Sequence, residues 1–172
     1  MALLAGNGLA ALGPTTWADL GCGEGTFTLA LAEVIAPGSI IHAMDRDATA
    51  LRKIPPQHRG IRIETHRGDF TSADWPFAAL DGILLANSLH YVSDQSTFLA
   101  ACESRMRERR FLIVEYDTDE SNPWVPYPVS RARLAALFTR EPRASIAWLG
   151  ERASRYRRAP IYAALVKNEA AA

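Results

Sequence analysis

A glycine-rich turn between a short apolar segment and an amphipathic segment most constrains how this 172-residue chain can fold. Residues 18–26 are Ala-Asp-Leu-Gly-Cys-Gly-Glu-Gly-Thr, between a predicted strand at 16–20 and a predicted helix at 26–36. A strand that passes through such a turn into a helix directs backbone N–H groups to the carboxyl edge of an α/β sheet. Nucleotides bind at that edge in open α/β sheets. The turn therefore predicts a fold class and the place of a ligand site.

Strand and helix patterns alternate along the chain, as they do in an α/β sheet. Apolar runs predict strands at residues 16–20, 39–44, 60–65, 80–86, 110–115, 144–149 and 160–166, and helices are predicted at 26–36, 47–54, 94–107 and 130–139. Connections of a dozen residues or more permit parallel strands, whereas the shorter last connection predicts an antiparallel hairpin. We expect a single domain over residues 1–172, with a mostly parallel seven-stranded sheet, helices on both faces and an antiparallel last strand.

The composition excludes several classes of protein. Hydrophobic residues make up 48% of the chain, enough for a packed core, and 19 basic side chains balance 19 acidic ones. A dedicated binder of duplex nucleic acid needs an excess of basic charge, so this partner is not expected. No apolar run approaches the ~18 residues that cross a bilayer. Only two cysteines and no cationic signal region indicate a cytoplasmic protein without a disulfide framework.

Charge is nevertheless unevenly placed. Residues 131–158 contain eight arginines against two glutamates, and residues 115–120 contain four acids. One interpretation is that these segments form solvated surfaces whose opposite charges cancel. The alternative is a basic C-terminal face that binds an anionic substrate or partner.

The spacing of the glycines argues against phosphate binding. A dinucleotide fingerprint needs G-x-G-x-x-G, and here the third glycine, Gly25, comes one position early. The phosphate-binding Walker loop needs a lysine that this turn lacks. Asp19 would also lie poorly beside a pyrophosphate, whereas a carboxylate suits a ligand with cationic groups.

The segment D-x-G-x-G-x-G resembles the first motif of the class I S-adenosylmethionine-dependent methyltransferases, and the resemblance extends from Thr16 to Lys167. It implies a Rossmann-like fold. Asp45, which ends the second strand, matches the acid that accepts both ribose hydroxyls, and Asp69 in Gly-Asp-Phe matches the position facing the exocyclic amine of adenine. Residues 85–92 match the strand exit beneath the methionine moiety and the transferred methyl group.

The resemblance thus implies S-adenosylmethionine as cofactor and S-adenosylhomocysteine as product. The residues implied to bind them are Asp19, Gly21, Cys22, Gly23, Gly25, Asp45, Arg46, Asp69, Phe70 and Asn87.

Cys22 and the four histidines are the other candidates for chemistry. Cys22 is either a reactive thiol at a helix N-terminus or, more simply, a small residue that fills a tight turn. His42, His58 and His66 lack the spacing of metal ligands along the chain, so no metal is predicted. His90 is a base, a substrate contact or a partly buried ring.

A sulfonium already activates its methyl group, so the protein must chiefly align the nucleophile and exclude water. A base is needed only if the methyl acceptor keeps its proton until attack. The candidate catalytic residues are those at the carboxyl ends of strands, namely His90, Glu115 and Tyr116.

The acceptor is predicted to be a small organic molecule, methylated on O, N or C. Methylases of base amines typically carry [DN]-P-P-[FYW] at the fourth strand exit, and the prolines are missing after Asn87. The loop at residues 116–130 is rich in prolines and is either a lid over the substrate or a cap on the core. His90, Tyr91, Trp124 and Tyr127 are the tentative substrate contacts.

Residues 1–15 are few compared with the helices that precede the first motif in the family. The expected consequences are an open pocket, a second chain that covers it, as in a homodimer, or a large substrate. The apolar Leu3, Leu4, Leu9 and Leu12 either pack on the sheet or form a dimer contact. A non-catalytic cofactor-binding subunit and an RNA or protein methylase are the alternative functions.

Overall fold

The computed structural model describes residues 2–4, 6, 8–72, 74–138, 144–154 and 159–168. The strands are β1 (Thr16–Leu20), β2 (Ile40–Asp45), β3 (Gln57–His58), β4 (Ile61–Arg67), β5 (Gly82–Ala86), β6 (Arg110–Tyr116), β7 (Ala144–Arg152) and β8 (Ile161–Asn168). The α-helices are α1 (Thr26–Ala32), α2 (Ala48–Leu51), α3 (Gln95–Glu103) and α4 (Arg131–Phe138). Four 3₁₀ turns complete the description, at η1 (Ala2–Leu4), η2 (Leu9–Leu12), η3 (Phe70–Ser72) and η4 (Leu89–Tyr91).

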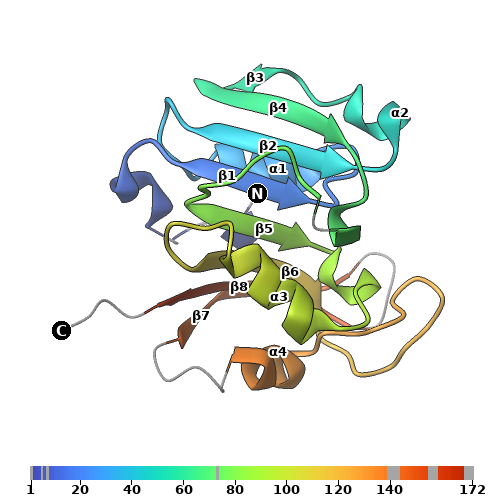
Figure 1. Cartoon of the computed structure of the whole chain (residues 1–172). Helices are drawn as coiled ribbons and strands as arrows, with labels where there is room; N and C mark the ends of the chain where they lie inside the picture. Colours follow the sequence, from blue (N-terminus) through green and yellow to red (C-terminus); the bar gives the residue numbers. More distant parts are fainter. Residues whose placement is uncertain are drawn as a thin grey trace.

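The strands form one sheet in the order β3-β4-β2-β1-β5-β6-β8-β7. The five strands from β4 to β6 pair in parallel, so their carboxyl ends meet at one edge, on the right in Figure 1. β8 runs antiparallel to β6, and β7 runs antiparallel to β8. The strands that follow β1 in the chain are added first on its β2 side and later on its β5 side. This change of side places the topological switch point of the sheet beside the carboxyl end of β1.

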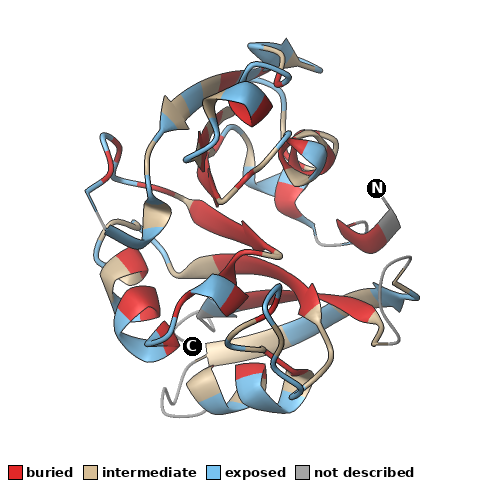
Figure 2. Ribbon diagram, turned by 90° about the vertical axis from the view of Figure 1, so that its right-hand side faces the viewer, coloured by how far each residue is buried: buried red, intermediate tan, exposed pale blue. Residues whose placement is uncertain are grey.

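Two apolar layers cover the two faces of the sheet because side chains alternate along each strand. On β1, Trp17 belongs to the cluster that contains Ala30 and Leu31 of α1. Ala18 and Leu20 belong to the opposite cluster, with Phe98 of α3 and Leu134 of α4. Figure 1 shows α3 and α4 in front of the sheet and α1 behind it, and Figure 2 shows the buried strands between these layers.

The predicted fold class is confirmed, with eight strands where seven were expected. The additional strand is β3, a two-residue strand antiparallel to β4 at the sheet edge, too short to leave a pattern in the sequence. The antiparallel hairpin of β7 and β8 was correctly predicted. The helices are shorter than predicted: α1 ends at Ala32, and α3 ends at Glu103.

The N-terminal leucines mostly pack on the sheet. Leu3, Leu4 and Leu9 are buried in the same cluster as α1, whereas Leu12 is 48% exposed. Packing on the sheet, one of the two expected alternatives, therefore applies to three of these four leucines, and a homodimer stays a prediction. No helix within the described residues is both long enough and apolar enough to cross a bilayer.

Trp17 on β1 and Gly82 on β5 are paired residues across neighbouring strands. The Trp17 ring is fully buried, and its Nε1 donates to the Thr15 hydroxyl at 3.1 Å. A Cβ atom at position 82 would lie 2.5 Å from the ring. The glycine is therefore required by close contact with the indole.

Gly82→Ala is expected to lower the free energy of unfolding by about 1–3 kcal/mol, because the rigid indole must move inside a packed core. Urea unfolding of both proteins measures the change. Gly150→Ala, also in a strand but with no atom near the added methyl group, is the matched control and should shift stability by less than about 0.5 kcal/mol. Equal losses for the two variants would contradict this account.

Candidate active site

The turn after β1 is held against the end of β2. The N–H groups of Gly21 and Cys22 both donate to the carbonyl of Met44, at 2.9 and 3.0 Å. Gly21 has a φ of +77°, and a Cβ there would lie 2.7 Å from Cβ of Ser88 and 3.1 Å from the Phe70 ring. Both the backbone angle and the contact require glycine at this position.

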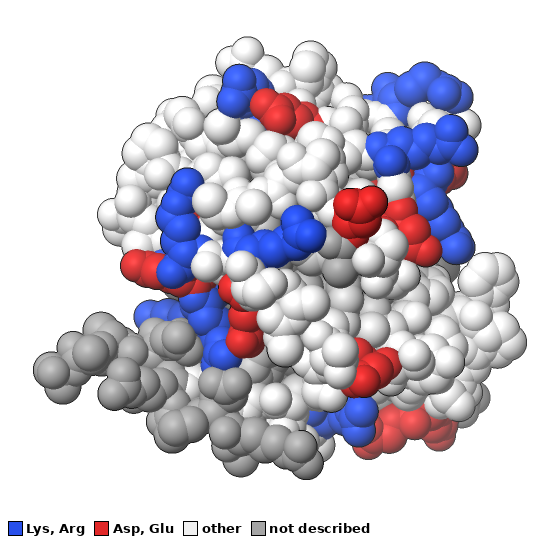
Figure 3. Space-filling model, in the orientation of Figure 1, with Lys and Arg blue, Asp and Glu red and all other residues white. Residues whose placement is uncertain are grey.

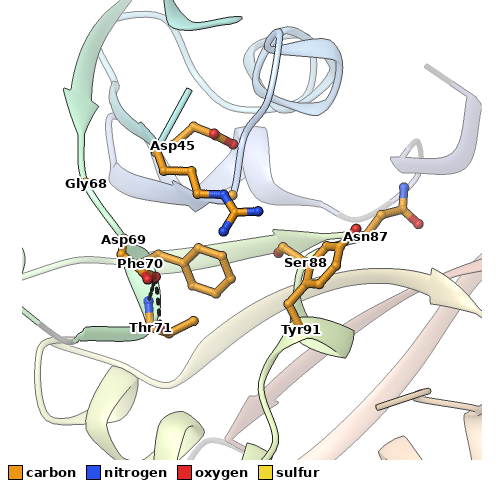
Figure 4. Close-up of a pocket in the computed structure, with 10 residues that line it drawn as sticks. Asp45, Gly68, Asp69, Phe70, Thr71, Asn87, Ser88 and Tyr91 are labelled. Carbon is orange, nitrogen blue, oxygen red and sulfur yellow. Dashed lines mark hydrogen bonds between the residues drawn. The ribbon is translucent and has the colours of Figure 1, made fainter. Parts of the chain in front are cut away.

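A cavity of about 390 Å³ opens next to this turn, between the carboxyl ends of β1, β2, β4 and β5. Its lining residues are Gly21, Asp45, Arg46, Gly68, Asp69, Phe70, Thr71, Asn87, Ser88 and Tyr91. In Figure 4, Asp45 lies at the top of this space, Asp69 and Thr71 at the lower left, and Asn87 at the right. The volume falls in the range of small-molecule sites.

Asp45 is fixed by the backbone around it. Its Oδ2 accepts from the N–H of Gly23 at 2.8 Å, and its Oδ1 accepts from the N–H of Asp47 at 2.9 Å. Each carboxylate oxygen has further lone-pair capacity. The side chain is thus oriented at the end of β2 and can still accept hydrogen bonds from a ligand.

Asp69 lies at the exposed rim of the cavity, just after β4. Its Oδ1 accepts from the hydroxyl of Thr71 at 2.7 Å and from the N–H of the same residue at 2.9 Å. These bonds lower the pKa of Asp69, the hydroxyl bond most. Asp69 is therefore ionised at neutral pH and is a hydrogen-bond acceptor.

Asp19 is fully buried beneath the turn, on the α1 face of β1. Its Oδ2 accepts from the Thr28 hydroxyl at 2.6 Å, while its Oδ1 has no hydrogen-bond partner among the described residues. Burial raises the pKa of Asp19 to about 7; the Thr28 bond opposes this shift, and the charge of Asp45 adds to it. A buried carboxyl oxygen without a partner is costly and suits a cationic donor.

The exit of β5 supplies two more polar atoms without partners. Asn87 has a φ of +53°, and its N–H donates to the Val114 carbonyl at 2.8 Å. Its Oδ1 and the Oγ of Ser88 are buried and make no hydrogen bond within the part of the chain that is described. Both residues line the cavity, and each has one buried oxygen that makes no hydrogen bond to the described residues.

His90 and Glu115 form a buried pair beside the cavity, with exposed fractions of 2% and 0%. The Nδ1 of His90 lies 2.6 Å from Oε2 of Glu115, whose Oε1 accepts from the backbone N–H of His90 at 3.2 Å. The ring centroid of His90 is 4.4 Å from that of Tyr91 and 6.4 Å from that of Tyr116. The three predicted catalytic residues are therefore brought together.

Six of the ten predicted cofactor residues line the cavity: Gly21, Asp45, Arg46, Asp69, Phe70 and Asn87. Asp19, Cys22, Gly23 and Gly25 lie in or beneath the turn instead. The Cys22 thiol is buried, and burial raises its pKa, as expected of a residue that fills the turn rather than a nucleophile. Gly25, with a φ of +84°, packs against Ile54, 2.7 Å from where a Cβ would lie.

Sequence reasoning did not single out Gly68, Thr71 and Ser88 as cavity residues. Gly68, Thr71 and Ser88 each lie next to a residue that was predicted. Their position beside a strand end is the feature of the sequence that could have identified them. Of the predicted substrate contacts, Tyr91 lines the cavity and is 49% exposed, while Trp124 and Tyr127 are 71% and 45% exposed outside it.

The loop at residues 116–130 lies near the edge of the sheet at which the parallel strands end, on the right in Figure 1. The N–H of Tyr127 donates to the carbonyl of His90 at 3.0 Å, and the hydroxyl of Tyr162 donates to the carbonyl of Val129 at 2.8 Å. Val125 and Val129 are buried, so the valines, rather than the exposed aromatic residues, cap the core.

The arginines at residues 131–158 lie partly outside the described residues, which include only Arg131, Arg133 and Arg152 of the eight. Arg131 pairs with Glu151 at 2.5 Å and with Asp117 at 3.6 Å. Figure 3 shows basic and acidic side chains interspersed over much of the visible face, with several basic side chains gathered at the upper right.

A model of the methyltransferase domain family matches residues 18–109. Uncharacterized methyltransferases of Mycobacterium bovis and Mycobacterium tuberculosis are 30% identical over 89 residues, which is 52% of this chain and 44% of theirs. The match thus spans less than half the length of these relatives.

Solved structures share the fold at low identity. Magnesium protoporphyrin IX methyltransferase from Synechocystis, solved with bound S-adenosylmethionine, has a TM-score of 0.63 and 17% identity over 90% of this chain and 71% of its own. A Burkholderia thailandensis 1,6-didemethyltoxoflavin-N1-methyltransferase, solved with its substrate and S-adenosylhomocysteine, has a TM-score of 0.64 and 21% identity over 94% and 75%.

The raised pKa of Asp19 predicts a pH-dependent stability of the protein without ligands. In the unfolded chain this carboxyl ionises near pH 3.8, but in the folded state it ionises near 7. The contribution of this group to the free energy of unfolding is therefore fully present below pH ~4 and is lost as the pH rises through 7.

Asp19→Asn keeps an acceptor for Thr28 and removes the ionisation. Relative to the wild type, the variant should gain up to about 4 kcal/mol in free energy of unfolding between pH 4 and pH 8, from about 3 pKa units at 1.36 kcal/mol each. Denaturant unfolding across this range measures the gain, with the exposed Asp74→Asn as control. Parallel pH profiles for Asp19→Asn and the wild type would contradict the assignment.

Proposed function

This chain belongs to the class I S-adenosylmethionine-dependent methyltransferases. We propose that it transfers the methyl group of S-adenosylmethionine to a small organic acceptor. The observation that carries the proposal is the cavity at the carboxyl edge, which Asp45 and Asp69 line and which adjoins the turn above the unpartnered oxygen of Asp19.

The polar groups around the cavity suit each part of this cofactor. Asp45 would accept from the two ribose hydroxyls through the lone pairs that Gly23 and Asp47 leave free. Asp69, held ionised by Thr71, would accept from the amine of adenine. The unpartnered Oδ1 atoms of Asp19 and Asn87 suit the ammonium group of the methionine moiety. A pyrophosphate would instead bring negative charge toward three carboxylates.

When bound, the sulfonium supplies a methyl group that is already activated for displacement. The residues of this chain would then orient the acceptor and accept its proton. Because Nδ1 of His90 is bonded to Glu115, the neutral ring carries its proton on Nδ1 and its lone pair on Nε2. Nε2 can take a proton, and the buried carboxylate of Glu115 stabilises the charged ring that results.

We further propose that aromatic side chains contact the acceptor. Tyr91 and Tyr127 both adjoin His90, one through its ring and the other through its backbone N–H, and both rings are about half exposed. Trp124 belongs to the same loop as Tyr127, and the ring centroid of Tyr116 is 6.4 Å from that of His90. Flat apolar faces near a base suit a small acceptor with an acidic O–H or N–H group.

An RNA or protein substrate is less well supported. The exposed Arg59, Arg62 and Arg107 are each paired with an acid, and the chain as a whole carries no excess of basic charge. We therefore retain the small-molecule acceptor as the proposal.

Asp45→Ala is expected to weaken binding of S-adenosylmethionine by about 1–3 kcal/mol through the loss of hydrogen bonds to the ribose. Calorimetric titration of both proteins measures the difference. Asp74→Ala, an exposed acid away from the cavity, should bind the cofactor as the wild type does. Equal affinities for Asp45→Ala and the wild type, or no binding by the wild type, would defeat the cofactor assignment.

Incubation with S-adenosylmethionine and a panel of small phenols, carboxylic acids and amines tests the activity, with S-adenosylhomocysteine formation as the readout. With the best acceptor, His90→Gln should lower kcat about 10²–10⁴-fold and leave cofactor affinity unchanged, because the ring acts on the acceptor. His58→Gln, which removes a histidine paired with Glu33, is the control. Cofactor binding without product from any acceptor would favour the non-catalytic subunit.

A further inference from the structure

Three side chains on the β2 and β4 strands form a cluster that the proposed methyl transfer does not use. His42, Glu64 and His66 each offer a ligand atom, and these three atoms lie within 4.8 Å of one another. Parallel pairing places His42 opposite Glu64, and His66 one pleat further along the same face. We propose that this cluster binds a divalent transition-metal ion, with Zn²⁺ as the ion to test.

The distances between the ligand atoms support the proposal. Tetrahedral zinc with bonds of 2.0–2.1 Å holds its ligand atoms about 3.3 Å apart. Nδ1 of His42 lies 3.0 Å from Nε2 of His66 and 3.3 Å from Oε2 of Glu64. The two imidazole rings are inclined by 51° and meet at these two nitrogens. Small side-chain movements would complete the site.

The surroundings of the cluster hold its rings in place. Phe77 stacks on the face of His42 with a centroid distance of 4.8 Å and an interplanar angle of 7°. A metal ion binds in the plane of an imidazole ring, so stacking on its face orients the ring and leaves the nitrogen lone pair accessible. Arg62 contacts Oε1 of Glu64 at 3.2 Å, which leaves Oε2 to face the histidines.

The hydrogen bonding and solvent access of the cluster also suit a metal. One of the two rings now donates a proton to the other, and binding replaces this shared hydrogen bond with two bonds to the ion. Three protein ligands leave one tetrahedral position for water, and the 37% exposure of the Glu64 side chain gives water access.

The expectation that the chain has no metal site rested on the spacing of histidines along the sequence. His42 and His66 are 24 residues apart, and only the register of two parallel strands brings them together. The cluster lies on the strands whose ends carry Asp45 and the segment with Asp69. A bound ion would therefore fasten β2 to β4 just behind the proposed cofactor cavity.

Titration of tag-free, chelator-treated protein with ZnCl₂ in a calorimeter tests the proposal, together with visible absorption after addition of Co²⁺. The expected result is one equivalent of bound metal, intense absorption bands of tetrahedral Co²⁺ and a rise in the Tm with Zn²⁺. His42→Gln, His66→Gln and Glu64→Gln should each weaken Zn²⁺ binding by at least about tenfold, since even partners outside the ligand set commonly matter by 10–100-fold.

His58→Gln is the matched control, because it removes a histidine of the neighbouring strand that pairs with Glu33 and not with the cluster. This variant should bind Zn²⁺ as the wild type does. Circular dichroism checks that each variant is folded, and the partly exposed Glu64→Gln keeps the test decisive if a histidine variant unfolds. Absence of wild-type binding up to millimolar Zn²⁺, or an affinity unchanged by Glu64→Gln and the folded histidine variants, would overturn the proposal.

Discussion

The hydrogen bonds that hold the glycine turn to the end of β2 set the positions of the cavity residues at the carboxyl edge of this sheet. Two consecutive N–H groups share the carbonyl of Met44, and the next residue of that strand, Asp45, accepts from Gly23 in return. The turn and the acid are therefore one unit in which each fixes the other. Because β1 also pairs with β5, this unit sets where Asn87 and Ser88 lie relative to Asp45.

The same kind of side chain serves different purposes at three neighbouring strand ends. Asp69 is exposed and bonded to Thr71, Asp45 is partly buried and bonded to the backbone, and Asp19 is buried with one oxygen unpartnered. Their environments lower the pKa of Asp69 and raise that of Asp19. Burial and local donors, rather than residue type, decide which acid carries a full charge beside the cavity.

Much of this arrangement could be predicted from local sequence. Strand patterns and the order of the elements indicated the sheet, because they depend on short-range periodicity. The resemblance to the methyltransferase motif indicated which residues at the strand ends line the cavity. The pairing of His90 with Glu115 was not visible, since it joins residues 25 apart on neighbouring strand ends. The His42–His66 contact was missed for the same reason. The ends of α1 and α3 depend on packing and capping, which periodicity does not fix.

If the proposed cofactor places its ammonium group at Asp19, its binding is coupled to the release of a proton. Because burial raises the pKa of Asp19 to about 7, a part of the ligand-free molecules holds this carboxyl protonated at neutral pH. A cation bound at its free oxygen favours the ionised form, so uptake of the proposed cofactor expels part of a proton into the solvent. The measured heat of binding then includes the ionisation enthalpy of the buffer that receives the proton. A lower pH weakens binding of the cofactor for the same reason.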